Sequence, residues 1–457
     1  MARLPHFFLT LAATFGFTAA VAVAQEKLPP PVAVDPLHLP ETLLPELKPI
    51  LATALEAAPR VLQGRLAVAI AQAGEEEARA GLYPTLRVGA GVDGRQELRR
   101  DLPGTQYSVK FSYGLLATQP LFHWGALANR ARLGTIQRAL AEHDFAEARR
   151  KLVLEVRAQY TALVVRALEL RQATEDDSRA GRRLATDATR AARGELAELD
   201  FAEEKLAREQ SRRQLERLAW QWDQARADFA ALAGLENFTA SVLPAEIPAL
   251  SDDWVARLKP DADPSHKSQR PDALAGPDLE LAAARLNYEI AHVRLKPMFD
   301  LVAGITQDEV SYTANIAAKF GADIRYVGLR MNWNIFDSGA SRAAASRARA
   351  DVKQKTLALD EATRGWQRQL ADGWRELMLA QDDLQLAEEI FTARAARLAA
   401  DQPRQAAGEI AVEDWAQRLA DQEQRRLALQ RQRAAQLLRV AEYALLRERD
   451  QSAPHFP

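Results

Sequence analysis

The chain has 457 residues, 27% charged and 47% hydrophobic, and its 60 basic and 62 acidic side chains leave a net charge of −2. This balance argues against a nucleic-acid-binding protein, which usually carries a basic surplus. The absence of cysteine excludes disulfides, zinc–thiolate centres and cysteine nucleophiles. Dense, balanced charge in a chain rich in Ala, Leu, Arg, Glu and Gln is typical of long helices and coiled coils.

Residues 1–24 have the pattern of a secretory signal peptide. Arg3 precedes an uncharged apolar segment from about Phe7 to Val23, and the segment ends in a small-x-small site at Ala24. We therefore expect export and cleavage after Ala24, with a retained signal anchor as the alternative. No later segment is apolar and long enough for a spanning helix, so the mature chain would enter a membrane only as strands of a closed barrel.

Prolines determine the prediction for the next segments. Residues 25–58 contain many prolines, which favour an extended arm over a continuous helix. A helical pattern runs from about Pro59 to Ala80 and opens the first structural repeat, which we place at 59–235. The helix is expected to end at the Gly81-Leu82-Tyr83-Pro84 segment, because glycine and then proline terminate helices.

The hydrophobic period changes to two at about 86–116. Apolar residues alternate with polar residues or glycine from Leu86 to Val92, and again from Tyr107 to Leu115, on either side of a polar segment. Two alternating segments around a polar loop predict a β-hairpin.

Helical periodicity returns at about Ala126. An apolar seam with spacings of four and three follows a heptad pattern; its members are Val156, Tyr160, Leu163, Ala167 and Leu170. A helix over 126–193 would have roughly 65 residues and span about 100 Å. After Gly194 a second helix is predicted over 195–233, followed by an irregular proline-rich linker at 236–276.

The same order of elements then repeats over 277–449. A hairpin is predicted at about 299–335 and long helices at about 340–406 and 410–449, with a flexible tail at 450–457. The spacing of this duplication is constant: Leu121-Phe122-x-x-Gly125 matches Ile335-Phe336-x-x-Gly339, 214 residues later. Arg190-x-x-x-Gly194 and Asp200 match Arg404-x-x-x-Gly408 and Asp414 at the same spacing.

Four strands in one chain cannot close a sheet in lipid, because unpaired edge groups there cost several kcal/mol each. Copies from other chains would have to complete a barrel. One strand face is apolar, and the other carries polar side chains that we expect to face the pore: Lys110, Arg330, Asn332 and Asn334. An apolar outer face with a polar interior is typical of transmembrane barrels. The alternative is a small sheet in a soluble domain.

These features together resemble the TolC family of outer-membrane efflux and type I secretion channels. The resemblance rests on the Leu/Ile-Phe-x-x-Gly exits from strand to helix, on Pro84 and Pro297 before the first strand of each hairpin, and on the paired Arg-x-x-x-Gly turns. It covers nearly the whole mature chain, from about Pro59 to Arg449.

The resemblance implies a mainly α-helical fold with a transmembrane β-barrel portion. In this family three copies share a twelve-stranded barrel and a long periplasmic tunnel. It further implies an outer-membrane channel with a long periplasmic extension, a passive exit duct without chemistry of its own. The implied partners are an inner-membrane transporter and a periplasmic adaptor (membrane fusion) protein, which would dock at the helix–helix turns. The docking residues carried over are Arg190, Gly194, Asp200, Arg404, Gly408 and Asp414.

The turn residues also have a sufficient structural explanation. Gly194 and Gly408 suit the left-handed position that ends a helix. Arg190 and Arg404 complement the negative end of the incoming helix, and acidic residues complement the start of the outgoing one. From the residues alone, a docking role and a purely structural role are equally open.

No pattern of enzymatic chemistry stands out. The seven histidines are not paired with other ligands at a metal-binding spacing, and no glycine-rich phosphate loop is present. We therefore expect no catalytic residues, cofactor or metal, and no nucleic-acid partner. The competing function is a soluble periplasmic coiled-coil adaptor or scaffold, which would have no need of four long strands with a continuous apolar face.

Overall fold

The computed structural model describes residues 39–98, 105–239, 243–250, 253–260, 271–312 and 319–450. The chain divides into two units, Met1–Pro36 and Leu37–Pro457, and every described residue belongs to the second. The expected signal peptide, the first part of the expected arm (25–38) and residues 451–457 of the expected tail lie outside the described residues.

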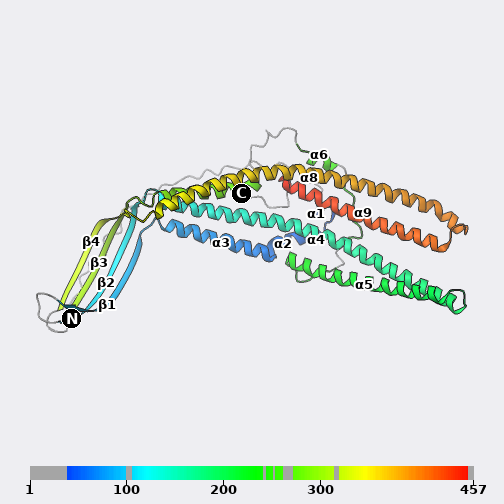
Figure 1. The fold of residues 1–457 in the computed structure, drawn as a ribbon, viewed down its shortest axis with the longest axis horizontal. Coiled ribbons are helices and arrows are strands. Elements are labelled where there is room, and N and C mark those ends of the chain that lie inside the picture. The colour runs from blue at the N-terminus through cyan, green and yellow to red at the C-terminus, as the bar shows by residue number, and fades with distance from the viewer. Residues whose placement is uncertain are drawn as a thin grey trace. The chain divides into compact units, whose positions relative to one another are not determined.

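The second unit contains two modules with the same order of elements (Figure 1). The first consists of α3 (Pro59–Ala80), β1 (Thr85–Leu98), β2 (Thr105–Phe122), α4 (Ala126–Ala192) and α5 (Glu198–Ala233). The second consists of α7 (Ala275–His292), β3 (Met298–Tyr312), β4 (Lys319–Asn332), α8 (Ala340–Ala406) and α9 (Val412–Leu446). The prediction of a mainly helical fold with a duplicated helix–hairpin–helix–helix module is confirmed.

The four strands form one antiparallel sheet in the order β1-β2-β3-β4. Strands β2 and β3 join the two hairpins, with Leu115 opposite Ile305. Val88 lies opposite Leu115 across the first hairpin. Strands β1 and β4 are therefore the outer strands within one chain.

The strands of both hairpins run further toward the hairpin tips than the sequence pattern indicated. The segment after Val92 was expected to be a loop because hydrophobic alternation stops there, but β1 continues to Leu98 and pairs with β2 from Thr105 onward. Backbone pairing does not require apolar side chains on both strands, so the ladder outlasts the hydrophobic pattern. At the other end β4 stops at Asn332, three residues before the predicted boundary at 335.

Each strand-to-helix joint contains two consecutive residues with positive φ. They are Trp124 (54°) and Gly125 (80°) before α4, and Ser338 (55°) and Gly339 (87°) before α8. The amide of Ala126 donates to the carbonyl of His123 at 2.9 Å, and Ala340 donates to Asp337 at 3.1 Å. Glycine suits the second position because it adopts the left-handed region without a steric penalty.

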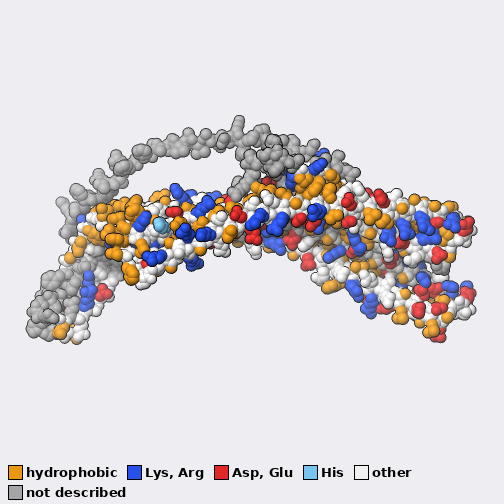
Figure 2. Space-filling view, turned by 45° about the horizontal axis from the view of Figure 1, so that its top comes forward, with side chains coloured by type: hydrophobic (Ala, Val, Ile, Leu, Met, Phe, Trp, Pro, Cys, Tyr) orange, Lys and Arg blue, Asp and Glu red, His pale blue; other side chains and the backbone are white. Residues whose placement is uncertain are grey.

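The long helices α4 and α8 each contain 67 residues. Part of the predicted seam on α4 is buried: Val156, Tyr160 and Leu163 lie in the larger of two hydrophobic clusters. Lys/Arg and Asp/Glu side chains are interspersed along the outer surface of the helices (Figure 2). No helix in the described part of the chain combines the length and apolarity needed to cross a lipid bilayer.

The extended arm predicted for 25–58 is wrong where the structure describes it. Residues Pro40–Leu43 form α1 and Leu47–Ala57 form α2. Pro40 begins α1, and Pro49 lies in the first turn of α2, where backbone N–H groups have no acceptor within the helix. Leu47 and Ala54 of α2 are buried in the larger cluster, so packing stabilises a helix that its prolines alone would disfavour.

The predicted irregular linker at 236–276 is largely irregular where it is described. It also contains α6 (Asp253–Leu258) and a 3-10 turn at Asp272–Leu274. Trp254 and Leu258 of α6 are fully buried in the smaller hydrophobic cluster, together with Leu377 of α8. This short helix therefore anchors the linker to the second module.

Candidate functional site: the sheet faces and the helical turns

One face of the sheet exposes a band of large apolar side chains. The strand register places them together because paired residues in antiparallel strands share a face. The members of this apolar band are Leu86, Val88, Val92, Val109, Phe111, Tyr113, Leu115, Leu301, Ile305, Val327, Leu329 and Met331. A contiguous exposed apolar surface of this kind indicates contact with lipid or with a protein partner.

The opposite face carries charged and polar side chains beside Leu116, Ile324 and Tyr326, and the register assigns three of the four predicted pore residues to it. Lys110 lies opposite Asp93, and Arg330 lies opposite Asp300. Asn332 is on the same face, two residues after Arg330. Asn334 lies beyond the end of β4, so the strand register gives it no face, and the prediction for that residue lacks support from the sheet.

The polar face ends in a hydrogen-bonded cluster next to α4. His123 Nε2 lies 2.8 Å from Asp300 Oδ1, and the Asn332 amide donates to Asp300 Oδ2 at 3.2 Å. The pore-residue prediction missed His123 and Asp300. Asp300 alternates with apolar residues in β3, which indicated its face, but nothing in the sequence linked it to a residue 177 positions away.

Two tryptophans lie where the strands pass into the long helices. The indole of Trp124 donates to the carbonyl of Pro297 at 2.7 Å, and that of Trp333 donates to Leu295 at 2.9 Å. Lys296 Nζ lies 4.6 Å from the centre of the Trp124 ring. Each indole thus bridges the strand-to-helix exit of one hairpin to the segment that enters β3.

The first helical turn joins α4 to α5. Gly194 has φ +73°, and the amide of Glu195 donates to the carbonyl of Arg190 at 2.9 Å. Asp200 is exposed in the first turn of α5, where a negative charge is favourable at a helix N-terminus. The structure places all three predicted residues of this turn within one compact helix–helix connection.

The second turn, between α8 and α9, has the same geometry. Gly408 has φ +80°, and the amide of Glu409 donates to the carbonyl of Arg404 at 2.9 Å. The Glu409 carboxylate also accepts from Arg404 Nε at 2.9 Å, which raises the pKa of the Arg404 guanidinium above its usual value. Asp414 is exposed on α9, at the position equivalent to Asp200.

Each turn is preceded by an aspartate that sequence reasoning missed. Asp187 and Asp401 are both 7% exposed and both contact an arginine of the turn, Arg190 or Arg404. They lie 214 residues apart, so the spacing of the duplication could have identified them.

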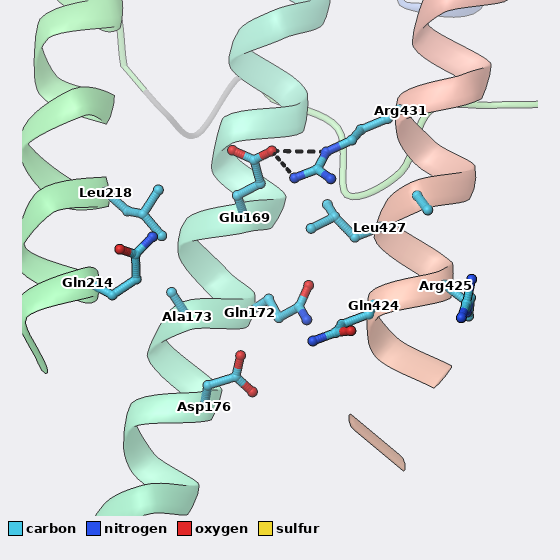
Figure 3. Close-up of a pocket in the computed structure, with 11 residues that line it drawn as sticks. Glu169, Gln172, Ala173, Asp176, Gln214, Leu218, Gln424, Arg425, Leu427 and Arg431 are labelled. Atoms are coloured by element: carbon cyan, nitrogen blue, oxygen red, sulfur yellow. Dashed lines mark hydrogen bonds and ion pairs between the residues drawn. The ribbon is translucent and has the colours of Figure 1, made fainter. Parts of the chain in front are cut away.

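A groove of about 560 Å³ lies between α4, α5 and α9 (Figure 3). Arg431 of α9 donates two hydrogen bonds to Glu169 of α4, at 2.6 and 3.1 Å, across one side of it. The amides of Gln172, Gln214 and Gln424 also line it. Leu218 and Leu427 line it as well, so the lining mixes polar and apolar side chains.

One group of residues in the described part of the chain brings possible metal ligands together, on α4. His143, Asp144 and Glu147 have ligand atoms within 4.8 Å of one another. His143 Nε2, however, lies 3.1 Å from the carbonyl of Asp272, and Lys151 pairs with Glu147 at 2.6 Å. A hydrogen bond and an ion pair thus already engage this group.

Comparisons with known proteins agree with this architecture. The profile of the family described as "Outer membrane efflux protein" matches residues 50–235 and 266–444. Among curated proteins, none matches this chain.

Solved structures with a similar fold include a membrane protein from Pseudomonas aeruginosa (19% identity, TM-score 0.71, covering 92% of this chain and 98% of that one). The CmeC outer membrane channel of Campylobacter jejuni is 12% identical, with a TM-score of 0.70 and coverage of 88% and 85%. The outer membrane protein VceC of Vibrio cholerae is 16% identical, with a TM-score of 0.66 and coverage of 89% and 96%.

Proposed function

Because this chain belongs to the outer membrane efflux protein family, and so is a channel component of an efflux system in the outer membrane, we propose that three copies form a continuous duct. Their twelve strands would close a barrel in the membrane, and their long helices would extend the duct into the periplasm. The duct passively conducts cargo supplied by an inner-membrane transporter, through a periplasmic adaptor at the helical turns.

The two-faced sheet is the observation that carries this proposal. One chain leaves β1 and β4 as outer strands, and a barrel shared between copies would pair them and remove the edges. The apolar band would then face lipid, and Lys110, Arg330 and Asn332 would face the water-filled lumen. A soluble adaptor or scaffold is disfavoured, because it would leave the apolar band exposed to water.

Strand length also fits the proposal. The strands contain 14, 18, 15 and 14 residues, more than the roughly 9–11 residues that a tilted strand needs to cross the hydrocarbon core. The apolar face also carries Asp323 and Arg325 of β4, which lie nearer the hairpin tip than Val327 and Leu329.

The first test is the native mass of the protein extracted with detergent from outer membranes washed with urea. A trimer that survives the wash is the expected result. Protein released by urea, or isolated as a monomer or dimer, would contradict the shared barrel and favour the adaptor.

The strand faces are tested by substitution. Val109→Asp with Leu329→Asp adds two charges to the apolar band, each costing up to about 2 kcal/mol in lipid, so the amount of trimer in the membrane should fall. Gly328→Asp is the matched control: it precedes Leu329 on the opposite face, and a Cβ there meets open space. Equal loss of trimer in the two variants would show that the faces are assigned wrongly.

The docking role of the turns is tested by reversing charge at both. The Asp200→Lys/Asp414→Lys variant should raise accumulation of an efflux dye to the level of cells lacking the channel, while trimers remain intact. Asp228→Lys/Glu442→Lys, which alters acidic residues of α5 and α9 away from the turns, should leave efflux unchanged. Normal efflux by the first variant would remove the turns as docking sites.

A further inference from the structure

Three charged residues precede the turn glycine at the same spacing in both modules. On α4 they are Arg183, Asp187 and Arg190; on α8 they are Arg397, Asp401 and Arg404. Because residues three and four apart lie on one face of a helix, each aspartate lies between an arginine one turn before it and an arginine one turn after it.

The contacts of the two aspartates are nearly the same. Asp187 lies 3.1 Å from Arg190 and 3.8 Å from Arg183. Asp401 lies 3.4 Å from Arg404 and 4.0 Å from Arg397. Both carboxylates are 7% exposed, whereas their arginine partners remain about half exposed or more. Each carboxylate thus neutralises two cations that would otherwise repel each other beside the turn.

The link to the outgoing helix differs between the modules. In the first, Glu204 of α5 accepts from Arg183 at 2.5 Å. The equivalent position on α9, 214 residues later, is Arg418, and it pairs with Asp401 instead. The charge at this position is reversed, yet at this level each hairpin has an ion pair across its two helices, because each incoming helix offers both a cation and an anion there.

We propose that Asp187 and Asp401 are positioning residues that fix the geometry of the two turns. The two arginines and the aspartate before each turn form an Arg–Asp–Arg clamp. An acidic residue at position 204 or 418 pairs with an arginine of this clamp, and a basic residue there pairs with its aspartate. Asp401 contacts both the incoming and the outgoing helix, whereas Asp187 contacts only α4 within this clamp. Loss of Asp401 should therefore loosen its hairpin more than loss of Asp187 loosens the first. The importance of this geometry for transport rests on the proposed docking function.

The test measures spin-label distances across each hairpin in the detergent-solubilised full chain. The chain has no cysteine, so Ala399 and Ala416 can be replaced by labelled cysteines without background. Ala185 and Ala202 are the equivalent exposed pair in the first hairpin. The unmodified clamp should give a narrow short-distance peak within each hairpin.

Asp401→Asn should lose the narrow peak between the labels of its own hairpin, and Asp401→Glu should restore most of it by keeping the charge. Asp187→Asn should broaden the peak of the first hairpin less. An unchanged narrow peak in Asp401→Asn would overturn the positioning role.

The charge-exchange variants test the clamp even if Asp401→Asn fails to fold. Arg418→Ala should lose the narrow peak, whereas Arg418→Glu should keep it, since it recreates the charges of the first module and can pair with Arg397. Equal loss in both variants would overturn the proposed exchange. Dye efflux measured in parallel separates the proposals: a lost peak with normal efflux supports the clamp and contradicts docking at that turn.

Discussion

The middle sections of the two modules share one contact but differ in what surrounds it. Tyr160 of α4 and Phe229 of α5 have ring centres 6.0 Å apart, and the equivalent Trp374 and Tyr443 of the second module are 5.6 Å apart. The first pair lies in the larger hydrophobic cluster with α2 and Phe238. The second lies in the smaller cluster with α6.

A buried arginine is a second difference between the middle sections of the two modules. Arg157 of α4 is fully buried and binds Glu41 through Nη2 at 2.6 Å and Nε at 3.0 Å, and Asp450 through Nη2 at 3.2 Å. The second module has Ala371 at the equivalent position. The duplicated scaffold has thus specialised in its first half, which holds both α1 and the segment after α9.

Of the substitutions that probe this difference, removal of the Arg157 side chain should lower the stability of the chain the most. Arg157→Met removes the cation that binds the buried carboxylates of Glu41 and Asp450, and removing one partner of such a buried ion pair costs about 3–5 kcal/mol. The urea midpoint of the far-ultraviolet circular dichroism signal of the detergent-solubilised protein should fall accordingly.

The matched control neutralises Arg157 together with the two carboxylates. Arg157→Met combined with Glu41→Gln and Asp450→Asn removes all three charges, and replacing a complete buried ion cluster is often close to neutral. This variant should recover most of the lost stability. A triple variant as unstable as Arg157→Met would mean that the size of the side chain, and not its charge, holds the segments together.

The aromatic contact shared by the two modules provides a second comparison, and the difference in stability expected between its two copies is of intermediate size. Phe229→Ala should destabilise the chain by about 3–5 kcal/mol, because Phe229 is fully buried and contacts both Tyr160 and Phe238. Tyr443→Ala should cost less, because Tyr443 packs in the smaller of the two hydrophobic clusters. Equal costs, measured by the same urea titration, would contradict the view that the first core is more tightly built.

The smallest effect is expected where α3 and α7 contact the long helices. Glu75 of α3 is 3% exposed, and its pKa lies below the ordinary value because the Thr135 hydroxyl donates to it at 2.8 Å and Arg138 and Arg79 are nearby. In the second module the partly exposed Lys355–Glu280 pair joins the corresponding helices, α7 and α8, at another position, and such surface pairs contribute roughly 0–1 kcal/mol.

A lowered carboxyl pKa gives this comparison a pH dependence. The contribution of Glu75 is complete above its ordinary pKa of 4.5 and is lost as the pH falls below that value through the folded-state pKa. Glu75→Gln should therefore be less stable than the parent at pH 7 and approach it in acid, when thermal unfolding is compared across pH. Glu280→Gln should show a smaller difference at pH 7.

The duplication made the long helices predictable from the sequence. The expected starts at Ala126 and near Ala340 agree with the structure, because a glycine that can adopt positive φ precedes each helix and appears in both copies. The predicted strand face of Lys110, Arg330 and Asn332 also agrees with the register, because side chains alternate along a strand and each can lie on only one of two faces.

Features that depend on distant residues were not predictable. Arg157 meets partners 116 and 293 positions away, and an arginine on a helix gives no sign that it will be buried. The helices α1 and α2 were missed because prolines dominate the local pattern, while the packing of Leu47 and Ala54 decides the outcome. The ends of the strands were missed because backbone pairing continues where hydrophobic alternation stops.

The strand register also limits how the length of this protein can change in evolution. Deleting one residue early in β4 would move every later side chain of that strand to the opposite face, so Arg330 would take the place of Leu329 on the apolar face. Deleting two would preserve the faces. The joints at Gly125 and Gly339 fix where each hairpin passes into a helix, so they cannot absorb an odd change. Tolerated insertions and deletions should therefore come in even numbers within the strands, and gain or lose whole turns within the helices.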